Sequence, residues 1–293
     1  MRLPCLPPVL KDIRAVEADI DILKVFQTFR APVSLVARAV YTGAVYASAN
    51  DQWLVLLRET EPLGPDSIVL EYPEFGPEWQ QSKGWIADGM VVLGSWRVHL
   101  STARTVNMHM PSLERWNFDD VLALADDVWP SGDVFSHIHD AAVRELLRQR
   151  ASAVVTALVE PAADVREPLL GLLGLGPGAT PSGDDFVVGL MAGLRFAFPE
   201  AARRLRTGIP HWGELVQITT ISSAMALSRA VEGRVFSDLN AVLLSLRDDY
   251  GVDRSAVAKL ASRGHTSGKD MLAGVVIGAT MPSNGGYRYG IKA

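Results

Sequence analysis

The sequence predicts an α+β protein in which a β-rich N-terminal domain, a sandwich or a barrel, precedes an all-helical C-terminal domain. Over residues 31–115, short runs rich in Val, Ile, Tyr and Trp are separated by Gly, Pro, Asn and Asp. From Phe118 onward, apolar residues recur instead at helical spacing. A block of strands followed by a block of helices is typical of α+β proteins and not of alternating α/β folds.

Four regions are expected in order. Residues 1–30 are predicted to be an N-terminal helical extension, with a helix over 9–29, because apolar side chains recur there at helical spacing. In the β-rich domain, 31–115, the expected strands are 33–48, 53–58, 67–72, 87–93 and 97–100. In the helical domain, 116–281, the expected helices are 118–128, 134–158, 185–198, 214–232, 239–248, 255–262 and 270–279. Residues 282–293 are expected to be a flexible tail.

Composition limits the function classes. With 293 residues, 48% of them hydrophobic, the chain can bury a large core and form two domains. Its net charge of −5, without a long basic run, argues against nucleic-acid binding. No apolar run reaches the roughly 20 residues of a membrane helix, and the N-terminus lacks a signal-peptide pattern, so we expect a cytoplasmic protein with no membrane partner. A mean hydropathy of +0.14 indicates a large core or a subunit interface, which allows a homo-oligomer.

The most informative segment is GLGPGATPSGDD, at residues 174–185. Dense glycine and proline fix a loop whose backbone can approach a ligand closely. An apolar helical run follows at once, and the start of a helix offers unpaired N–H groups and a positive dipole end to an anion. The sequence therefore predicts a site for a small anionic substrate at this glycine-rich segment.

A second copy of this pattern lies 85 positions later, because residues 266–279 align with residues 181–194. Both copies contain Ser-Gly-x-Asp and continue as an apolar helix with glycines four apart. Ser-x-x-Asp is a capping-box pattern, so Asp185 and Asp270 are predicted to have structural capping roles. Glycines at this spacing allow two helices to approach closely. We therefore expect the two helices to pack together and to start at one shared region.

Candidate site residues follow from the two copies. Asp184 lies outside the capping pairs and is an expected catalytic acid or base, and His265, just before the second copy, is the other expected catalytic residue. The ordinary alternatives are a first-turn aspartate favoured by the helix dipole and a packed histidine. No residue is assigned as a metal ligand, although magnesium is a candidate cofactor. The residues expected to bind the substrate anion are Gly176, Gly178, Thr180, Ser182, Gly183, Ser267 and Lys269.

Other patterns are weaker. His137 and His139 resemble a metal-binding fragment, but His-x-His on a helical stretch directs the two rings apart. The only cysteine, Cys5, excludes an intramolecular disulfide. No Walker loop, Gly-x-Ser-x-Gly elbow or dinucleotide fingerprint is present. A polar pocket, or local hydrogen bonding alone, would account for the hydroxyls of Thr219, Thr220, Ser222 and Ser223.

Three blocks together resemble the AllH family, formerly a domain of unknown function. They are GLGPGATPSGDDFVVGLMAG, TTISSAMALSRAVEGRVFSDL and GHTSGKDMLAGVVIGA, in this order. GPDSI at residues 64–68 also looks like that family, and the resemblance extends over about residues 33–280. The sequence departs from the family pattern at Ala179, where Leu is common, and at Lys269, where an aromatic residue is common. The second departure puts a general anion-binding role for Lys269 in doubt.

The resemblance implies a subunit of oxamate carbamoyltransferase, an enzyme of allantoin degradation that exchanges a carbamoyl group between oxamate and carbamoyl phosphate. It further implies other enzyme subunits as partners, and carbamoyl phosphate or an oxamate-like molecule as the small anionic substrate. Two alternatives stay open. One is a non-catalytic scaffold subunit of a multi-subunit enzyme, and the other is a magnesium-dependent hydrolase of a phosphorylated ligand that uses Asp184 and Asp185.

Overall fold

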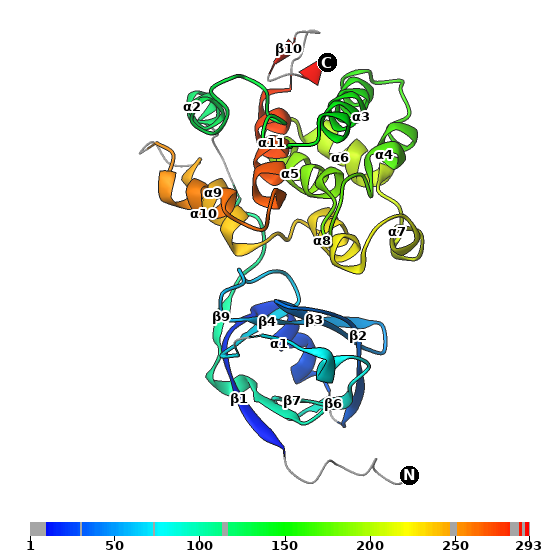
Figure 1. Ribbon diagram of the computed structural model, residues 1–293, viewed down its shortest axis with the longest axis vertical. Helices are drawn as coiled ribbons and strands as arrows, with labels where there is room; N and C mark the ends of the chain where they lie inside the picture. The colour runs from blue at the N-terminus through cyan, green and yellow to red at the C-terminus, as the bar shows by residue number, and fades with distance from the viewer. Residues whose placement is uncertain are drawn as a thin grey trace. The chain divides into compact units, whose positions relative to one another are not determined.

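The chain forms two compact units that divide between Met108 and His109 (Figure 1). The structure is a computed structural model that describes residues 10–29, 31–72, 74–112, 117–246, 251–281, 287–288 and 291–292. The first unit is built mainly of strands and the second almost entirely of helices. The predicted α+β class, with the β-rich part first, is therefore confirmed.

The first unit is a closed barrel, which decides between the two expected β architectures. Within the described residues, eight strands follow the order β5-β4-β3-β2-β6-β7-β8-β1, and pairing of β1 with β5 closes the sheet. β9 pairs with the end of β1. The strands are β1 (Lys11–Asp19), β2 (Val33–Tyr41), β3 (Ala44–Ala49), β4 (Gln52–Arg58), β5 (Ser67–Leu70), β6 (Lys83–Ala87), β7 (Met90–Leu93), β8 (Trp96–His99) and β9 (Arg104–Val106).

The barrel interior holds its own hydrophobic core. Alternate side chains of the strands, such as Leu35 and Ala37 of β2, point inward and are buried, as the two-residue period of a strand requires. Helix α1 (Ile20–Gln27) lies within the ring of strands in Figure 1 and adds Ile22 and Phe26 to this core. Asp19 begins the helix by accepting a hydrogen bond from the Asp21 N–H at 3.1 Å. The other oxygen of Asp19 accepts from the backbone N–H of Asp66 at 2.8 Å.

The predicted N-terminal helical extension is wrong. Residues 11–19 form β1, and only Ile20–Gln27 are helical. Ile13 and Ala15 face the core with strand spacing, but a bulge between Ala15 and Glu17 shifts the register before Ala18. This irregular spacing resembles a helical period, and pairing with β5, β8 and β9 decides for a strand. The single strand expected over 33–48 is a hairpin of β2 and β3.

The second unit packs its helices around one central pair, α5 and α11, which lie side by side in Figure 1. Nearly every residue of both helices is buried. The α-helices of this unit are α2 (Phe118–Val128), α3 (Ala141–Val159), α4 (Arg166–Leu172), α5 (Ser182–Ala197), α6 (Pro199–Gly208), α7 (Trp212–Ile218), α8 (Ile221–Val231), α9 (Ser237–Ser245), α10 (Arg254–Ala261) and α11 (Ser267–Thr280).

The helical prediction needs three corrections. The helix expected over 134–158 begins only at Ala141. The one expected over 214–232 is broken at Thr219 and Thr220 into α7 and α8. Helices α4 and α6 are short and were not expected. The predicted flexible tail falls largely outside the described residues, and within it Tyr287–Arg288 pairs antiparallel with Ile291–Lys292.

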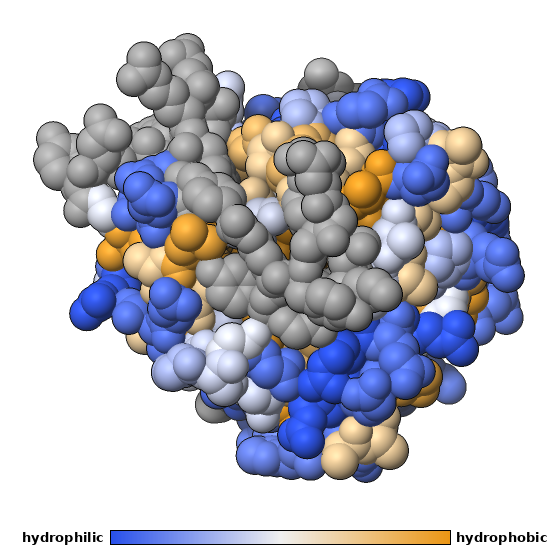
Figure 2. All heavy atoms as spheres, turned by 90° about the horizontal axis from the view of Figure 1, so that it is seen from above, coloured by the Kyte–Doolittle hydropathy of each residue, from blue (hydrophilic) through white to orange (hydrophobic). Residues whose placement is uncertain are grey.

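The positive mean hydropathy is explained by the two buried cores. On the face shown in Figure 2, hydrophilic residues predominate and apolar residues occupy smaller areas between them. In the described part of the chain, the large apolar side chains classed as exposed are Leu146 of α3, at 38%, and Leu244 of α9, at 42%. None of the described helices combines the length and apolarity needed to cross a membrane.

Candidate functional site

Glycines hold α5 and α11 in direct backbone contact. A Cβ atom at Gly189 would overlap the carbonyl oxygen of Met271, and one at Gly193 would overlap that of Val275. Both contact points advance along the two helices in the same direction, so the helices run parallel and begin at the same end. Gly274 of α11 lies equally close to the backbone of α5. The predicted packing of the two glycine-faced helices is confirmed.

The two copies of the glycine pattern also touch at their starts. The hydroxyl oxygens of Thr180 and Ser267 lie 2.7 Å apart, and those of Ser182 and Thr266 lie 3.4 Å apart. These contacts join segments that are 84 to 87 residues apart in the sequence. The expectation that both helices start at one shared region is therefore confirmed.

A third helix start, that of α8, meets the same loop. Thr220 is the N-cap of α8 and accepts from the Ser223 N–H at 3.2 Å. Its hydroxyl donates to the carbonyl oxygen of Ala179 at 2.6 Å, and the Ser222 hydroxyl donates to the same oxygen at 2.5 Å. These side chains, which we expected either to line a pocket or to bond locally, therefore fasten α8 to the glycine-rich segment.

The loop between α4 and α5 depends on left-handed backbone at its glycines. Gly176 has φ 120°, and a Cβ there would stand 2.8 Å from the Ser182 nitrogen. Gly178 has φ 99° and open space around it. Within the described residues, the backbone N–H groups of Gly176, Gly178, Ala179 and Thr180 form no hydrogen bond. Residues 177–179 are exposed and Gly176 and Thr180 are partly exposed, so this stretch of backbone lies at the protein surface.

Asp184 is buried and fixes the glycine-rich segment in place through hydrogen bonds. Its Oδ1 accepts from the Gly174 N–H at 2.8 Å, and its Oδ2 accepts from the Thr219 hydroxyl. Burial raises the pKa of Asp184, while hydrogen bonds from Thr219 and Gly174 oppose that rise. Both oxygens are thus engaged inside the protein, which supports a positioning role beside the catalytic role that we predicted.

The predicted capping roles of Asp185 and Asp270 are wrong. The N-cap residues of the two helices are Pro181 and Thr266, and neither forms a side-chain cap. Asp270 instead uses its Oδ1 to contact His137 Nε2 at 2.8 Å. Each helix begins at the serine itself, so the aspartate falls one position too far into the helix for a capping box.

Asp185 and Asp270 form a buried acidic pair. The pKa of Asp185 lies well above its usual range, first because of burial and second because of the charge on Asp270. Hydrogen bonding by Ser267 and the charge on Arg263 act in the opposite direction, and Asp184 raises the pKa slightly further. The Oδ2 atoms of Asp185 and Asp270 are buried and have no hydrogen-bond partner in the described part of the chain.

The sequence reasoning missed the place of His137. Its side chain is only 6% exposed, and its Nδ1 accepts from the indole N–H of Trp129 at 3.3 Å. No spacing rule links His137 to Asp270, because 133 residues separate them. The neighbouring Val134, Phe135 and Ile138 are buried, so the apolar residues of this stretch were the one sequence signal that it approaches the core.

His265 and Lys269 stand apart from these contacts. His265 is exposed, and its ring centroid lies 6.3 Å from that of His139. Lys269 is half-buried in the first turn of α11 and forms no hydrogen bond or ion pair within the described residues. Gly183 is buried, with its N–H bonded to the Leu175 carbonyl at 2.9 Å, so it packs the loop against α5. The catalytic and binding roles of His265 and Lys269 stay predictions.

No metal centre is assembled by the residues that the structure describes. Among them, no group of three or more His, Cys, Asp or Glu side chains is placed to hold a metal ion.

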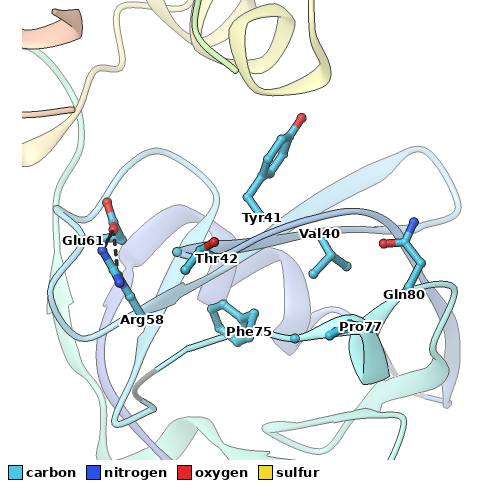
Figure 3. A pocket seen from close by; sticks show the side chains of 10 residues that line it. Val40, Tyr41, Thr42, Arg58, Glu61, Phe75, Pro77 and Gln80 are labelled. Atoms are coloured by element: carbon cyan, nitrogen blue, oxygen red, sulfur yellow. Dashed lines mark hydrogen bonds and ion pairs between the residues drawn. The ribbon is translucent and has the colours of Figure 1, made fainter. Parts of the chain in front are cut away.

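The barrel carries a separate hollow of about 670 Å³ (Figure 3). Phe75 and Pro77 form part of its wall, and Tyr41 stands at its edge. Its two charged lining residues, Arg58 and Glu61, pair with each other at 2.8 Å. Because these charges offset each other, this hollow offers less to an anion than the glycine-rich segment does.

Comparison with known families finds a match within the helical unit. Residues 172–279 match the AllH family. The matching model is described as oxamate carbamoyltransferase subunit AllH. This AllH segment runs from the end of α4 to α11 and contains the glycine-rich segment, the start of α8 and the second glycine copy. The resemblance found in the sequence is confirmed over these residues. No solved structure matches the chain.

Proposed function

We propose that this chain is a subunit of a carbamoyltransferase-type enzyme and binds a small anionic substrate at residues 176–180. The description of the AllH model supplies the activity and the expectation of partner subunits. The substrate is carbamoyl phosphate or an oxamate-like molecule, both of which carry an anionic group and a carbamoyl amide. The function would place the protein in the cytoplasm.

The observation that carries this proposal is the set of unbonded N–H groups on Gly176, Gly178, Ala179 and Thr180. They lie where α5, α8 and α11 begin, and each helix start contributes a positive dipole end. Backbone N–H groups fixed in a glycine-rich turn suit phosphate and carboxylate oxygens. In carbamoyl transfer, donors of this kind would stabilise charge that develops on the leaving phosphate oxygen.

The loop is preorganised by the groups around it. Asp184 accepts hydrogen bonds from Gly174 and Thr219. The hydroxyls of Thr220 and Ser222 donate to the carbonyl oxygen of Ala179. That carbonyl is thereby turned toward α8 and away from an incoming anion. Donors that are already fixed need no reorganisation when charge appears, which is the condition for effective electrostatic stabilisation.

A second candidate function is a substrate-binding subunit whose catalytic groups come from a partner. One observation favours it: both oxygens of Asp184 accept hydrogen bonds from the protein itself. In that case His265 is the remaining candidate for acid–base work on this chain. Binding without turnover by the isolated chain, and turnover only with partners present, would support this candidate.

The binding proposal is tested by titrating the full chain with carbamoyl phosphate in a calorimeter. Gly178→Ala strains a backbone at φ 99°, and Gly132→Ala is its matched control at φ 73°, because an added Cβ meets no atom within 4 Å at either position. The strain costs about 1–2 kcal/mol at each site, but only the first should displace the loop N–H groups. We expect Gly178→Ala alone to weaken binding about tenfold or more. Equal binding by both variants would contradict the proposed site.

A further inference from the structure

Two histidines meet at the start of the second glycine copy. The ring centroids of His139 and His265 lie 6.3 Å apart, and the two ring planes are inclined by 68°. Both side chains are exposed, and neither imidazole forms a hydrogen bond or ion pair with the residues that the structure describes. Two imidazoles that lie together at the surface without protein partners are available to a ligand.

The backbone that leads to His139 is fixed by the two residues before it. The buried ring of His137 contacts Asp270 of α11 at 2.8 Å. The carbonyl oxygen of Ile138 accepts from the Arg144 guanidinium at 2.9 Å. His139 is therefore fastened to the first turn of the helix that His265 precedes. Positioning of this kind before a ligand arrives lowers the entropy lost on binding.

The histidine pair adjoins the glycine-rich segment through the residues that follow His265. The Thr266 hydroxyl lies 3.4 Å from that of Ser182, and the Ser267 hydroxyl lies 2.7 Å from that of Thr180. Consecutive Cα atoms are about 3.8 Å apart, so the Cα of His265 lies within about 7.6 Å of the Cα of Ser267. The pair is therefore a neighbour of the proposed anion site and is not part of it.

The charged side chains around the pair leave one cation without a partner. Those engaged by protein groups are Asp140, which caps α3, Arg144, Arg254, paired with Asp127, Arg263, paired with Asp238, and Asp270. Asp184 and Asp185 of α5 are buried, and Lys259 of α10 is exposed. Lys269 in the first turn of α11 has no hydrogen bond or ion pair in the described residues. The helix dipole opposes a cation there, and a bound anion would offset that cost.

Resting on the proposed function, we propose that His139 and His265 bind the carboxylate of the oxamate-like substrate, as a second anion position beside the glycine-rich segment. Carbamoyl transfer brings together two anionic molecules, one with a phosphate and one with a carboxylate. The backbone N–H groups of the loop suit the phosphate. A neutral imidazole has one N–H donor, so the pair offers one donor to each carboxylate oxygen. Two positions allow both anions to be bound at once.

This assignment predicts that oxamate binding is coupled to proton uptake. An imidazole changes charge between about pH 5 and pH 8, and an anion beside it favours the charged form. The carboxylate itself stays ionised over this range. Oxamate should therefore take up protons when it binds at about pH 7, and its affinity should rise as the pH falls from about 8 to about 6. Exposed histidines with only a structural role would not produce this coupling.

The test is calorimetry of oxamate binding to the full chain, with inorganic phosphate present to occupy the loop. Buffers of different ionisation enthalpy report the proton uptake. Because both histidines are exposed, His139→Gln and His265→Gln should fold as wild type does. Each should weaken oxamate binding about tenfold and reduce the proton uptake. His211→Gln, at an exposed histidine that begins α7, is the matched control and should change neither.

The outcomes separate this inference from the function on which it rests. If carbamoyl phosphate binds, but oxamate does not bind or binds equally to all variants without proton uptake, the role of the histidine pair is overturned and the loop site stands. If wild type binds neither carbamoyl phosphate nor oxamate, the proposed anion site is contradicted, and the inference fails with it. If His139→Gln and His265→Gln lose affinity and proton uptake while His211→Gln keeps both, the inference is supported.

Discussion

Gly189 of α5 lies against the backbone carbonyl of Met271 in α11, with no space between them for a methyl group. This contact sets how closely the two central helices approach. It also sets where they begin, and the hydroxyls of Thr180 and Ser267 meet at that end. The geometry of the candidate site therefore depends on a packing contact in the middle of the helices.

Replacing Gly189 with alanine should destabilise the protein. The added Cβ collides with backbone, which cannot rotate away as a flexible side chain can, so we expect a loss of about 2–3 kcal/mol in the free energy of unfolding, typical of overpacked cores. Gly213→Ala in α7 is the control, because a Cβ there meets nothing within 4 Å. Urea unfolding measures both. Equal stability of the two variants would refute the close contact.

The protein should lose stability as the pH rises, because folding raises the pKa of Asp185 well above its usual range. A carboxyl with a raised pKa binds its proton more tightly in the folded state than in the unfolded state. Its contribution is complete below the unfolded pKa, near 3.8, and disappears as the pH passes through the folded value. Asp184 acts in the same direction.

Asp185→Asn provides the comparison for this pH dependence. Unfolding free energies of wild type and variant, measured in urea between about pH 5 and pH 9, should diverge in slope. The variant should lose less stability with rising pH, since only the contribution of Asp184 remains. Parallel slopes would show that Asp185 does not hold a proton in the folded protein.

His137→Phe should also be strongly destabilising. The phenyl ring keeps most of the volume but removes the donor to Asp270, whose carboxyl is fully buried. Leaving one partner of a buried pair alone costs about 3–5 kcal/mol. Asp270→Asn in the His137→Phe background should recover part of this loss, because the charge is then removed. A double-mutant cycle by thermal unfolding would show whether the two changes couple, and additive effects would contradict the pairing.

Much of the fold could be predicted from local sequence patterns. The predictions that failed concern contacts between residues far apart in the sequence. The helices α2, α5 and α11 and the pairing of the two glycine copies follow from apolar spacing and internal similarity. The helix predicted over residues 11–19 was wrong because a bulge inside this barrel strand spaces its apolar residues much as a helix would. Closure of the sheet depends on pairing between residues 50 or more positions apart, which local spacing does not encode.

The candidate site divides in the same way. Its position is visible in the glycine-rich segment, whose backbone demands are local. The hydrogen-bond partners of its carboxyls are not visible in the local sequence. His137 lies 133 residues from Asp270 in the chain, and Thr219 lies 35 residues from Asp184. The capping prediction failed because each helix starts one residue earlier than the capping box needs, at the serine and not after it.

The most direct test of the proposed function is carbamoyl transfer between carbamoyl phosphate and oxamate in extracts of the source cells after removal of this chain. The extract supplies the partner subunits, and the purified full-length chain is added back. The proposed function predicts that transfer stops without the chain, and that wild type and Gly132→Ala restore it more fully than Gly178→Ala. Transfer that continues undiminished without the chain would contradict the proposed function.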